Sequence, residues 1–402
     1  MDTEDKKYQL LDNKDNIDTN SFMTDKPNNT KQKTALILSG GGARAAYQVG
    51  VLKAISEFLS DQSDNPFPII CGTSAGSINA IALASNANNF HQGVQKITHV
   101  WSNFELGHVF HVDAKHLFGR IAHWIWSHVG FGNWRKGPGS ILDNSPLRKL
   151  LSNYINFERI DEALENGALH AYCLTACSYS SGESTTFFDG DASIENWTRT
   201  HREGKREKMS IDHLMASSAI PLIFESVKIG HEHFGDGSMR QASPISPAFH
   251  LGADKILIIG LKKEKDTDVV EKKHRPSLGQ ISGYVLDTLF LNSLQSDVER
   301  MERLNRILSE NTDNQDSKFK KVEHIIINPS EDIADIANKY HHELPKCFKL
   351  ALSFIGINKG NSRRFVSYLM FTKKFCSELI ELGYNDALRQ KDQLTGFLRP
   401  PS

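Results

Sequence analysis

Two stretches decide the fold: TALILSGGGARAAYQVGVLKAISEFLS (residues 34–60) and PIICGTSAGSINAIALA (residues 68–84). The apolar run that opens the first stretch predicts a buried parallel strand, which the three glycines end. Apolar residues at helical spacing predict a helix over 43–60. A second strand at 68–71 and a helix of small residues at 75–84 follow. This βαβα order predicts an α/β fold with a mostly parallel sheet.

Further apolar runs extend the predicted sheet. Residues 171–178 and 184–188 predict a hairpin. DKILIIGL (254–261) and VEHIIIN (322–328) each predict a buried strand. Between these two strands, a long amphipathic helix is expected over 278–309, and its Leu and Met stripe is predicted to be a packing face rather than a lipid sensor.

The composition suggests four segments along the chain. Residues 1–33 are polar and predict a disordered tail, because they bury too little apolar surface to offset their ordering entropy. The folded core spans 34–261, a charged loop follows at 262–276, and a helical C-terminal extension over 277–392 is expected to pack on the core. Residues 101–134 hold eight aromatic side chains, for which we favour core packing over an acyl pocket or a lid.

The overall charge of the chain bears on two kinds of partner, nucleic acid and anionic membrane. The 402 residues contain 47 Lys and Arg against 48 Asp and Glu, a net charge of −1, which argues against bulk electrostatic binding to nucleic acid or to anionic membrane.

There is no apolar window of membrane-spanning length and no secretory signal pattern at the N-terminus. Five cysteines without zinc-binding spacing predict reduced thiols. We expect a cytoplasmic protein with peripheral, local membrane contact, and export without a signal is left open.

The first chemical motif is GTSAG at 72–76, which fits G-x-S-x-G. Ser74 lies between an apolar strand and a helix of small residues, where a sharp turn would expose its hydroxyl as a nucleophile. Gly72 and Gly76 allow the neighbouring backbone to approach closely. The alternative is a plain turn in which Ser74 caps the helix, and this motif alone favours neither reading.

The second motif is GGGAR at 40–44. Glycines between a strand and a helix leave backbone N–H groups available for an anion, either a phosphate or the oxyanion of an acyl-transfer intermediate. A dinucleotide site is disfavoured because the second strand ends in a serine motif instead of the acid that such a site needs. A Walker P-loop is disfavoured because no Gly-Lys-Ser/Thr follows. An oxyanion loop beside a serine nucleophile remains.

A nucleophilic serine needs a base. Seventeen histidines are present, but none lies in a recognisable motif. The other candidate is Asp236 in the turn Phe234-Gly235-Asp236-Gly237-Ser238, whose flanking glycines permit a tight loop. An ordinary Asp-Gly turn is the alternative reading of that segment.

Four blocks in this order resemble the patatin-like phospholipase family: SGGGARAAYQVGVLKAI, GTSAGSINA, ASSAIPLIF (216–224) and FGDGSMRQASPISP. The resemblance is strong over 34–261 and weaker through the helical C-terminus. It implies a three-layer α/β sandwich with a mostly parallel central sheet, a Ser–Asp dyad without histidine, and lipid acyl hydrolysis.

The resemblance assigns residues by position. Ser74 matches the nucleophile and Asp236 the base. The oxyanion block consists of three glycines and one arginine (Gly40, Gly41, Gly42 and Arg44). Three other glycines support the two turns that carry Ser74 and Asp236 (Gly72, Gly76 and Gly237). Ala45 stands where the family usually has Gly, and Ser238 where Gly or Ala is common. For Arg44 we favour bracing of the glycine loop over contact with a phosphate head group.

The resemblance also implies the reaction and the partners. The expected enzyme is a phospholipase A or lysophospholipase-type serine esterase that forms an acyl-enzyme, acts on a phospholipid or other glycerolipid at a peripheral membrane surface, and uses no cofactor and no metal ion. Two alternatives are an acyltransferase that uses the same acyl-enzyme and a non-catalytic lipid-binding protein of the same fold.

Overall fold

The computed structural model describes residues 32–59, 65–129, 139–263, 277–310, 321–354 and 363–399. The chain divides into two units, Met1–Lys31 and Gln32–Ser402. The predicted tail therefore lies almost entirely outside the described residues, as does most of the predicted charged loop at 262–276. The description below concerns the second unit.

The centre of this unit is a mixed sheet in which five neighbouring strands run parallel, in the order β10-β9-β1-β2-β3. These strands are β1 (Thr34–Leu38), β2 (Ile69–Thr73), β3 (Ala171–Ser178), β9 (Lys255–Ile259) and β10 (Glu323–Ile327). Beyond β3 the sheet continues through β4 (Ser184–Gly190), β6 (Arg202–Arg206) and β5 (Trp197–Arg199). The short strands β7 (Val227–Ile229) and β8 (Glu232–Asp236) form a hairpin that pairs antiparallel with the end of β3.

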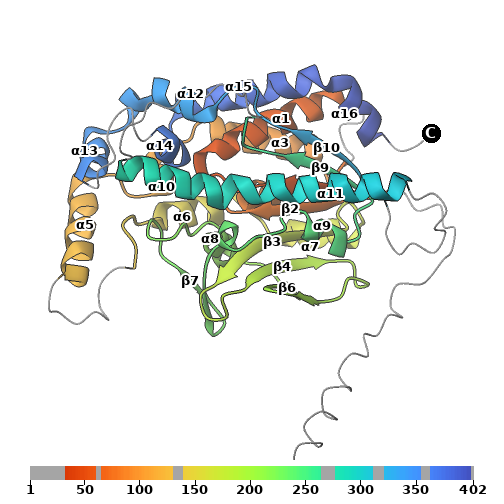
Figure 1. Cartoon of the computed structure of the whole chain (residues 1–402), viewed down its shortest axis with the longest axis horizontal. Helices are drawn as coiled ribbons and strands as arrows, with labels where there is room; N and C mark the ends of the chain where they lie inside the picture. The colour runs from red at the N-terminus through yellow and green to blue at the C-terminus, as the bar shows by residue number, and fades with distance from the viewer. Residues whose placement is uncertain are drawn as a thin grey trace, which may run out of the picture. The chain divides into compact units, whose positions relative to one another are not determined.

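Whereas β4 and β6 form the lower edge of the view in Figure 1, helices lie beside the parallel strands. In the first half of the chain they are α1 (Ala46–Phe58), α2 (Ala75–Ala84), α3 (Phe90–Ser102), α4 (Leu106–Val109), α5 (Ala114–Val129), α6 (Ser145–Tyr154), α7 (Glu158–Glu165), α8 (Ile211–Ser217) and α9 (Ser246–His250). In the second half they are α10 (Leu278–Asp287), α11 (Ser293–Glu310), α12 (Ile333–Lys339), α13 (Lys346–Phe354), α14 (Arg363–Leu369), α15 (Lys373–Arg389) and α16 (Lys391–Leu398).

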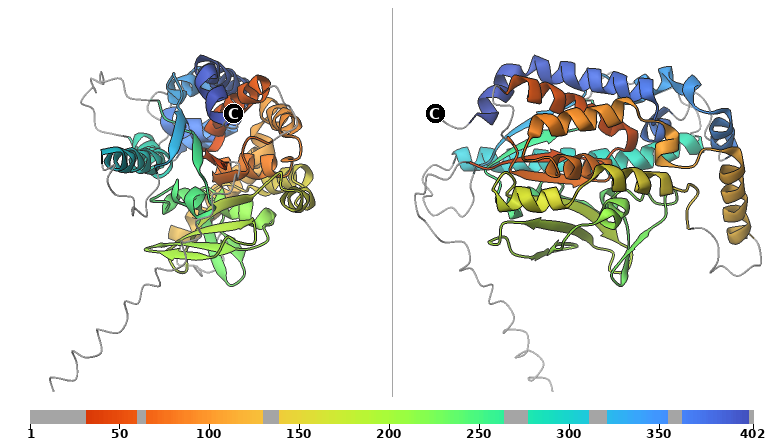
Figure 2. Two further views of the ribbon diagram at one scale, coloured as in Figure 1. Left: turned by 90° about the vertical axis from the view of Figure 1, so that its right-hand side faces the viewer. Right: turned by 180° about the vertical axis from the view of Figure 1, so that it is seen from behind.

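The sheet separates two apolar cores. In β1, Leu36 and Leu38 point into one core and Ala35 and Ile37 into the other, because successive side chains of a strand point to opposite faces. Side chains of α1, α3 and α15 fill the first core, and those of α9 and α11 the second. The sheet and the helices packed against it are shown from two other sides in Figure 2. The predicted three-layer α/β fold with a mostly parallel sheet and a helical C-terminal region is confirmed.

The structure differs from the sequence expectations at several boundaries. The helix predicted at 43–60 begins with a 3-10 turn over Gly42–Ala45 and becomes α-helical only at Ala46. The helix predicted at 278–309 is interrupted by a π turn over Thr288–Asn292. In the C-terminal extension, β10 confirms the strand predicted at 322–328, and the helices continue to Leu398, beyond the predicted end at 392.

Helices α1 and α15 pack so closely that their backbones are in contact at two glycines. A Cβ atom on Gly50 would lie 2.0 Å from the carbonyl oxygen of Ile380, and one on Gly383 would lie 2.1 Å from the carbonyl oxygen of Tyr47. Backbone atoms cannot swing aside as a flexible side chain does. The two glycines therefore fix how closely the C-terminal helix approaches the helix that follows the glycine loop.

We predict that Gly50→Ala and Gly383→Ala each lower the free energy of unfolding by about 1–3 kcal/mol, because the added methyl group overpacks this contact. Gly396→Ala on α16 is the matched control. Among the described residues outside its own helix, none has an atom within 4 Å of its Cβ position, so alanine should stabilise the protein by up to about 1 kcal/mol. Urea unfolding followed by circular dichroism measures all three, and wild-type stability of the first two variants would contradict the packing argument.

Candidate active site

Ser74 occupies a strained turn between β2 and α2. Its backbone has φ 54° and ψ −129°, in the region that residues with a side chain rarely adopt. Ser74 stands at the N-cap position of α2, but its side chain makes no capping hydrogen bond. The capping alternative is therefore wrong, and the hydroxyl is directed elsewhere.

The Ser74 hydroxyl donates to the Asp236 carboxylate, with 2.6 Å between Oγ and Oδ2. Strand β3 brings the two residues together. Thr73, the last residue of β2, lies opposite Thr175 of β3, and Asp236 at the end of β8 lies opposite Ala176, the next residue of β3. Two segments 162 residues apart thus meet at the carboxyl end of one strand.

Asp236 is completely buried, and two further hydrogen bonds hold it in place, one at its carboxylate and one at its backbone. Its Oδ1 accepts from the backbone N–H of Ser238 at 2.9 Å, and its own N–H donates to the carbonyl of Ala219. Burial raises the pKa of the Asp236 carboxyl from 3.8 to about 7, while hydrogen bonds from Ser74 and Ser238 act in the opposite direction. A carboxyl with a pKa near neutrality is suited to accept and return a proton at physiological pH.

Serines that the sequence reasoning did not single out hold the turn around Ser74. The N–H of Ser74 donates to Ser217 Oγ at 3.0 Å, and this hydroxyl donates to the carbonyl of Thr175 at 2.7 Å. Ser77 Oγ donates to the carbonyl of Ser74 at 2.5 Å. The available signal was position: Ser217 lies in the block ASSAIPLIF, and Ser77 directly follows the G-x-S-x-G motif.

The glycine loop passes directly beside Ser74. A Cβ on Gly40 would lie 2.9 Å from Ser74 Cβ and 2.6 Å from Ser238 Oγ. Gly42 has φ +56°, and a Cβ there would lie 2.2 Å from the carbonyl oxygen of Tyr368. The first N–H groups of the 3-10 turn that follows have no partner within the turn, which makes this edge suitable for an anion next to Ser74.

The supporting glycines of the two turns also lie at backbone contacts. A Cβ on Gly76 would lie 2.2 Å from the carbonyl oxygen of Leu38, and one on Gly237 would lie 2.1 Å from that of Thr175. Gly72 faces the backbone of α2 in the same way, at 2.5 Å from Ser77 Cα. Any side chain at these positions would displace the strand ends that hold Ser74 and Asp236.

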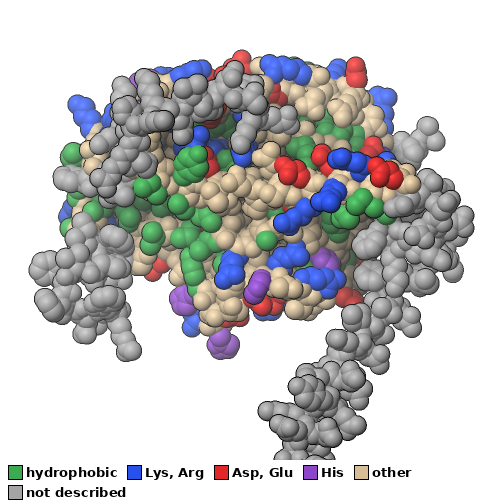
Figure 3. Space-filling model, viewed as in Figure 1, with side chains coloured by type: hydrophobic (Ala, Val, Ile, Leu, Met, Phe, Trp, Pro, Cys, Tyr) green, Lys and Arg blue, Asp and Glu red, His purple; other side chains and the backbone are tan. Residues whose placement is uncertain are grey.

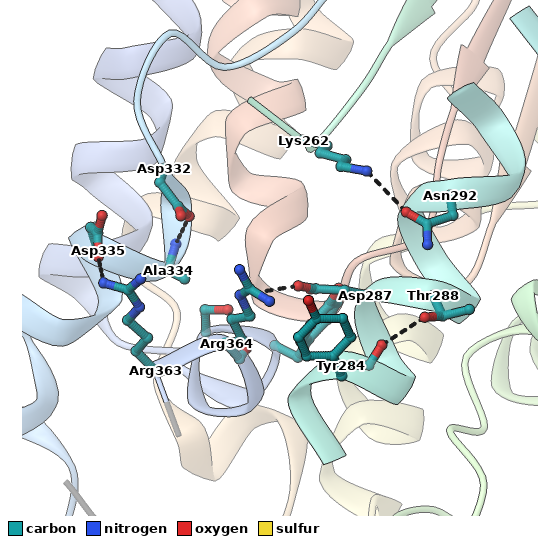
Figure 4. Close-up of polar contacts among 12 residues, drawn as sticks. Lys262, Tyr284, Asp287, Thr288, Asn292, Asp332, Ala334, Asp335, Arg363 and Arg364 are labelled. Carbon is teal, nitrogen blue, oxygen red and sulfur yellow. Dashed lines mark hydrogen bonds and ion pairs between the residues drawn. The ribbon is translucent and has the colours of Figure 1, made fainter. Parts of the chain in front are cut away.

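The side chain of Arg44 contacts α10 and α14 rather than Ser74. Its Nε donates to Ser367 Oγ at 2.8 Å, and Nη2 lies 3.2 Å from the carboxylate of Asp287. The guanidinium lies 3.9 Å from the ring centre of Tyr368, whose hydroxyl donates to the same Asp287. Figure 4 shows Asp287 beside Arg364, a second arginine at 3.5 Å. These contacts match the bracing interpretation of Arg44.

The described part of the aromatic segment packs in the core. Trp101, Phe104 and Phe110 are buried, and Trp101 Nε1 donates to Asn79 Oδ1 on α2 at 2.8 Å. The side chains of residues 124–134 lie outside the description. The favoured interpretation of this segment as core therefore holds for its first half.

The model of the patatin-like phospholipase family matches residues 36–249, more than half of the chain. The chain therefore belongs to the patatin-like phospholipase family, which makes it a lipid hydrolase in general terms. A comparison with curated protein sequences gives no match.

The solved structures that are similar to this chain include the following two. VipD from Legionella pneumophila is 13% identical, with a TM-score of 0.34, over 90% of this chain and 67% of VipD. Human GIVD cytosolic phospholipase A2 is 11% identical, with a TM-score of 0.45, over 92% of this chain and 60% of the human protein. The chain thus spans about two thirds or less of these proteins.

Across the described ranges, no helix has the length and apolar character needed to cross a bilayer.

The raised pKa of the Asp236 carboxyl predicts how the stability of the folded protein depends on pH. The folded state holds the proton up to about pH 7, whereas an unfolded Asp releases it near 3.8. The folded protein therefore binds more protons between these values, and stability falls as pH rises through that window. Asp236→Asn removes this loss. We predict that the variant gains stability over wild type from about pH 4 to pH 7, on the order of a few kcal/mol, and no more above pH 7.

Thermal or urea unfolding at pH 4.5, 6 and 8 measures this difference. Asp191→Asn is a control of opposite sign. Hydrogen bonds from Ser193 lower the pKa of the exposed Asp191 carboxyl, so that this substitution should reduce stability at neutral pH and lose its effect in acid. A pH-independent difference for Asp236→Asn would contradict the raised pKa.

Proposed function

We propose that the protein hydrolyses a carboxylic ester bond of a phospholipid or other glycerolipid, with Ser74 as nucleophile and Asp236 as general base. The observation that carries this proposal is the 2.6 Å hydrogen bond from Ser74 Oγ to a fully buried carboxylate. The family supports a lipid substrate, which a peripheral membrane surface would present.

The reaction proceeds in two acyl-transfer steps. Asp236 accepts the Ser74 proton as Oγ attacks the ester carbonyl. The tetrahedral intermediate collapses, the leaving alcohol takes the proton from Asp236, and the acyl group stays on Ser74. Asp236 then removes a proton from water, which attacks the acyl-enzyme, and the proton returns to Ser74 as the fatty acid leaves.

The glycine loop supplies the oxyanion site in this proposal. Backbone N–H groups of Gly41 and Gly42 stabilise the negative charge on the former carbonyl oxygen, and one such donor contributes about 3–4 kcal/mol. Gly40 lies against Ser74 because no side chain separates them. Arg44 acts indirectly, by holding the loop to α14 and α10.

Substitution of the dyad tests the proposal. Ser74→Ala should abolish release of fatty acid from mixed phospholipid vesicles, because it removes the nucleophile. Asp236→Asn should lower the rate by several orders of magnitude, because an amide cannot accept the proton. Mass spectrometry of the products measures the rate and also identifies the lipid cleaved.

Ser152→Ala, on the exposed face of α6, is the matched control and should retain wild-type activity. A fluorophosphonate probe should label wild type and Ser152→Ala but not Ser74→Ala. Wild-type turnover by Ser74→Ala would overturn the assignment.

The hydroxyl of Ser238 gives a finer test of the base. Its hydrogen bond lowers the pKa of Asp236, so Ser238→Ala should raise that pKa. A hydrogen bond of about 0.5–1.5 kcal/mol corresponds to about 0.4–1 pH unit. We predict that activity rises with pH with a midpoint near 7 in wild type and at higher pH in Ser238→Ala. A pH–rate profile of kcat/KM measures both midpoints, and an unchanged or lower midpoint in the variant would exclude this role.

A further inference from the structure

A buried polar cluster lies beside the dyad and takes no part in the reaction as proposed above. Figure 3 shows charged side chains of both signs over one face of the molecule. The members of the buried cluster are instead uncharged and at most 8% exposed (Thr73, Thr175, Thr186 and Gln241). Gln241 belongs to the block FGDGSMRQASPISP and follows Asp236 on the same segment, and the sequence reasoning assigned it no role.

Gln241 connects the ends of two neighbouring strands. Its Oε1 accepts from the Thr73 hydroxyl at 2.8 Å, and its Nε2 donates to Thr175 Oγ1 at 3.1 Å. Thr73 ends β2, and Thr175 lies opposite it in the parallel pairing with β3. The Thr175 hydroxyl is also hydrogen-bonded to that of Thr186 on β4, at 3.2 Å. One amide group thus ties the end of β2 to β3, and through β3 to β4.

Together with the dyad, this amide gives the segment after β8 two attachments to the end of β2. Asp236 accepts from Ser74, and Gln241 accepts from Thr73, the residue before it. A single hydrogen bond sets the distance between two groups but lets them pivot, whereas a second bond from the adjacent residue also sets their orientation. The angle at which Ser74 Oγ faces the carboxylate therefore depends on Gln241 as well as on the dyad.

The turn at Ser74 needs such support because its backbone is strained. Ser74 has φ 54°, and a conformation of this kind persists only where the surrounding contacts hold it. Ser217 and Ser77 bond to the backbone of Ser74 itself, whereas Gln241 holds the residue at the base of the turn. Its second bond fixes Thr175, whose carbonyl accepts from Ser217. Gln241 thus supports the turn both directly and through β3.

We propose that Gln241 is a positioning residue of the enzyme, an inference that rests on the ester hydrolysis proposed above. Its amide holds the end of β2 at the spacing and angle from which Ser74 Oγ attacks the ester while Asp236 takes the proton. Gln241 acts through Thr73 and Thr175, so its loss should slow turnover and leave substrate binding unchanged. Misplacement of a reacting group by about 1 Å can slow a reaction about 100-fold.

The effects on kcat and on KM together test this role. Gln241→Met keeps the length of the side chain but removes both hydrogen bonds. Its kcat for p-nitrophenyl butyrate, expressed per Ser74 titrated with a fluorophosphonate, should fall about tenfold or more, while KM stays within about twofold of wild type. Thr73→Val removes one of the two bonds from the other side and should also lower kcat. The double variant should be no slower than Gln241→Met, because both changes remove the same contact.

Asn65→Leu is the matched control. The Asn65 amide ties the beginnings of the same two strands, since Nδ2 donates to the carbonyls of Phe67 at 2.9 Å and Ala168 at 3.0 Å, just before β2 and β3. Asn65→Leu should lose stability, as Gln241→Met does, because each removes an amide that joins β2 to β3. Its kcat per titrated Ser74 should nevertheless stay within about twofold of wild type.

A kcat for Gln241→Met within about twofold of wild type, with Ser74-dependent hydrolysis intact, would overturn the positioning role and leave the proposed function standing. An equal fall of kcat in Asn65→Leu would also overturn it, because the loss would then follow from destabilisation alone. If Gln241→Met does not fold, Thr73→Val decides by the same criterion. Failure of the proposed function would appear separately, as ester hydrolysis that persists in Ser74→Ala.

Discussion

The hydrogen bond between Ser74 and the buried Asp236 is the interaction on which the rest of the site depends. A carboxylate without solvent is costly in its charged form, so its pKa rises toward neutrality and proton exchange with a hydroxyl becomes possible near physiological pH. The fold maintains this unfavourable arrangement. Strand β3 pairs with both β2 and β8 and so holds the two residues together, while Ser217 and Ser77 hold the strained backbone of Ser74 in place.

A second set of contacts connects the glycine loop with the C-terminal part of the chain. Arg44 leaves the loop and meets Asp287 before the π turn and Ser367 on α14. Phe290, which touches Gly40, lies with its ring centre 5.2 Å from that of Tyr368. The loop that lies next to Ser74 is thus positioned by residues that are more than 200 positions away in the sequence.

Much of this arrangement followed from the sequence, for identifiable reasons. Apolar runs bounded by glycine predicted the βαβα unit, because strand and helix periods differ and glycine ends both. The G-x-S-x-G pattern and the Asp-Gly turn marked Ser74 and Asp236. Their contact did not follow from spacing, because it depends on the antiparallel pairing of β8 with β3. The supporting role of Ser217 was also missed, since it arises from contacts with Ser74 and Thr175, which are distant in the sequence, and such contacts leave no local pattern.

The contact between Gly42 and the carbonyl oxygen of Tyr368 has a consequence for how the protein can be divided. The segment that defines the family ends at residue 249, ahead of β9, the strand that covers one side of β1, and ahead of α14. A truncated protein that ends there would expose the edge of β1 that pairs with β9. It would also lose Tyr368, whose backbone contacts the glycine loop at Gly42. The smallest unit that keeps the glycine loop in place is therefore longer than the segment that the family model matches, and it includes β9 and α14.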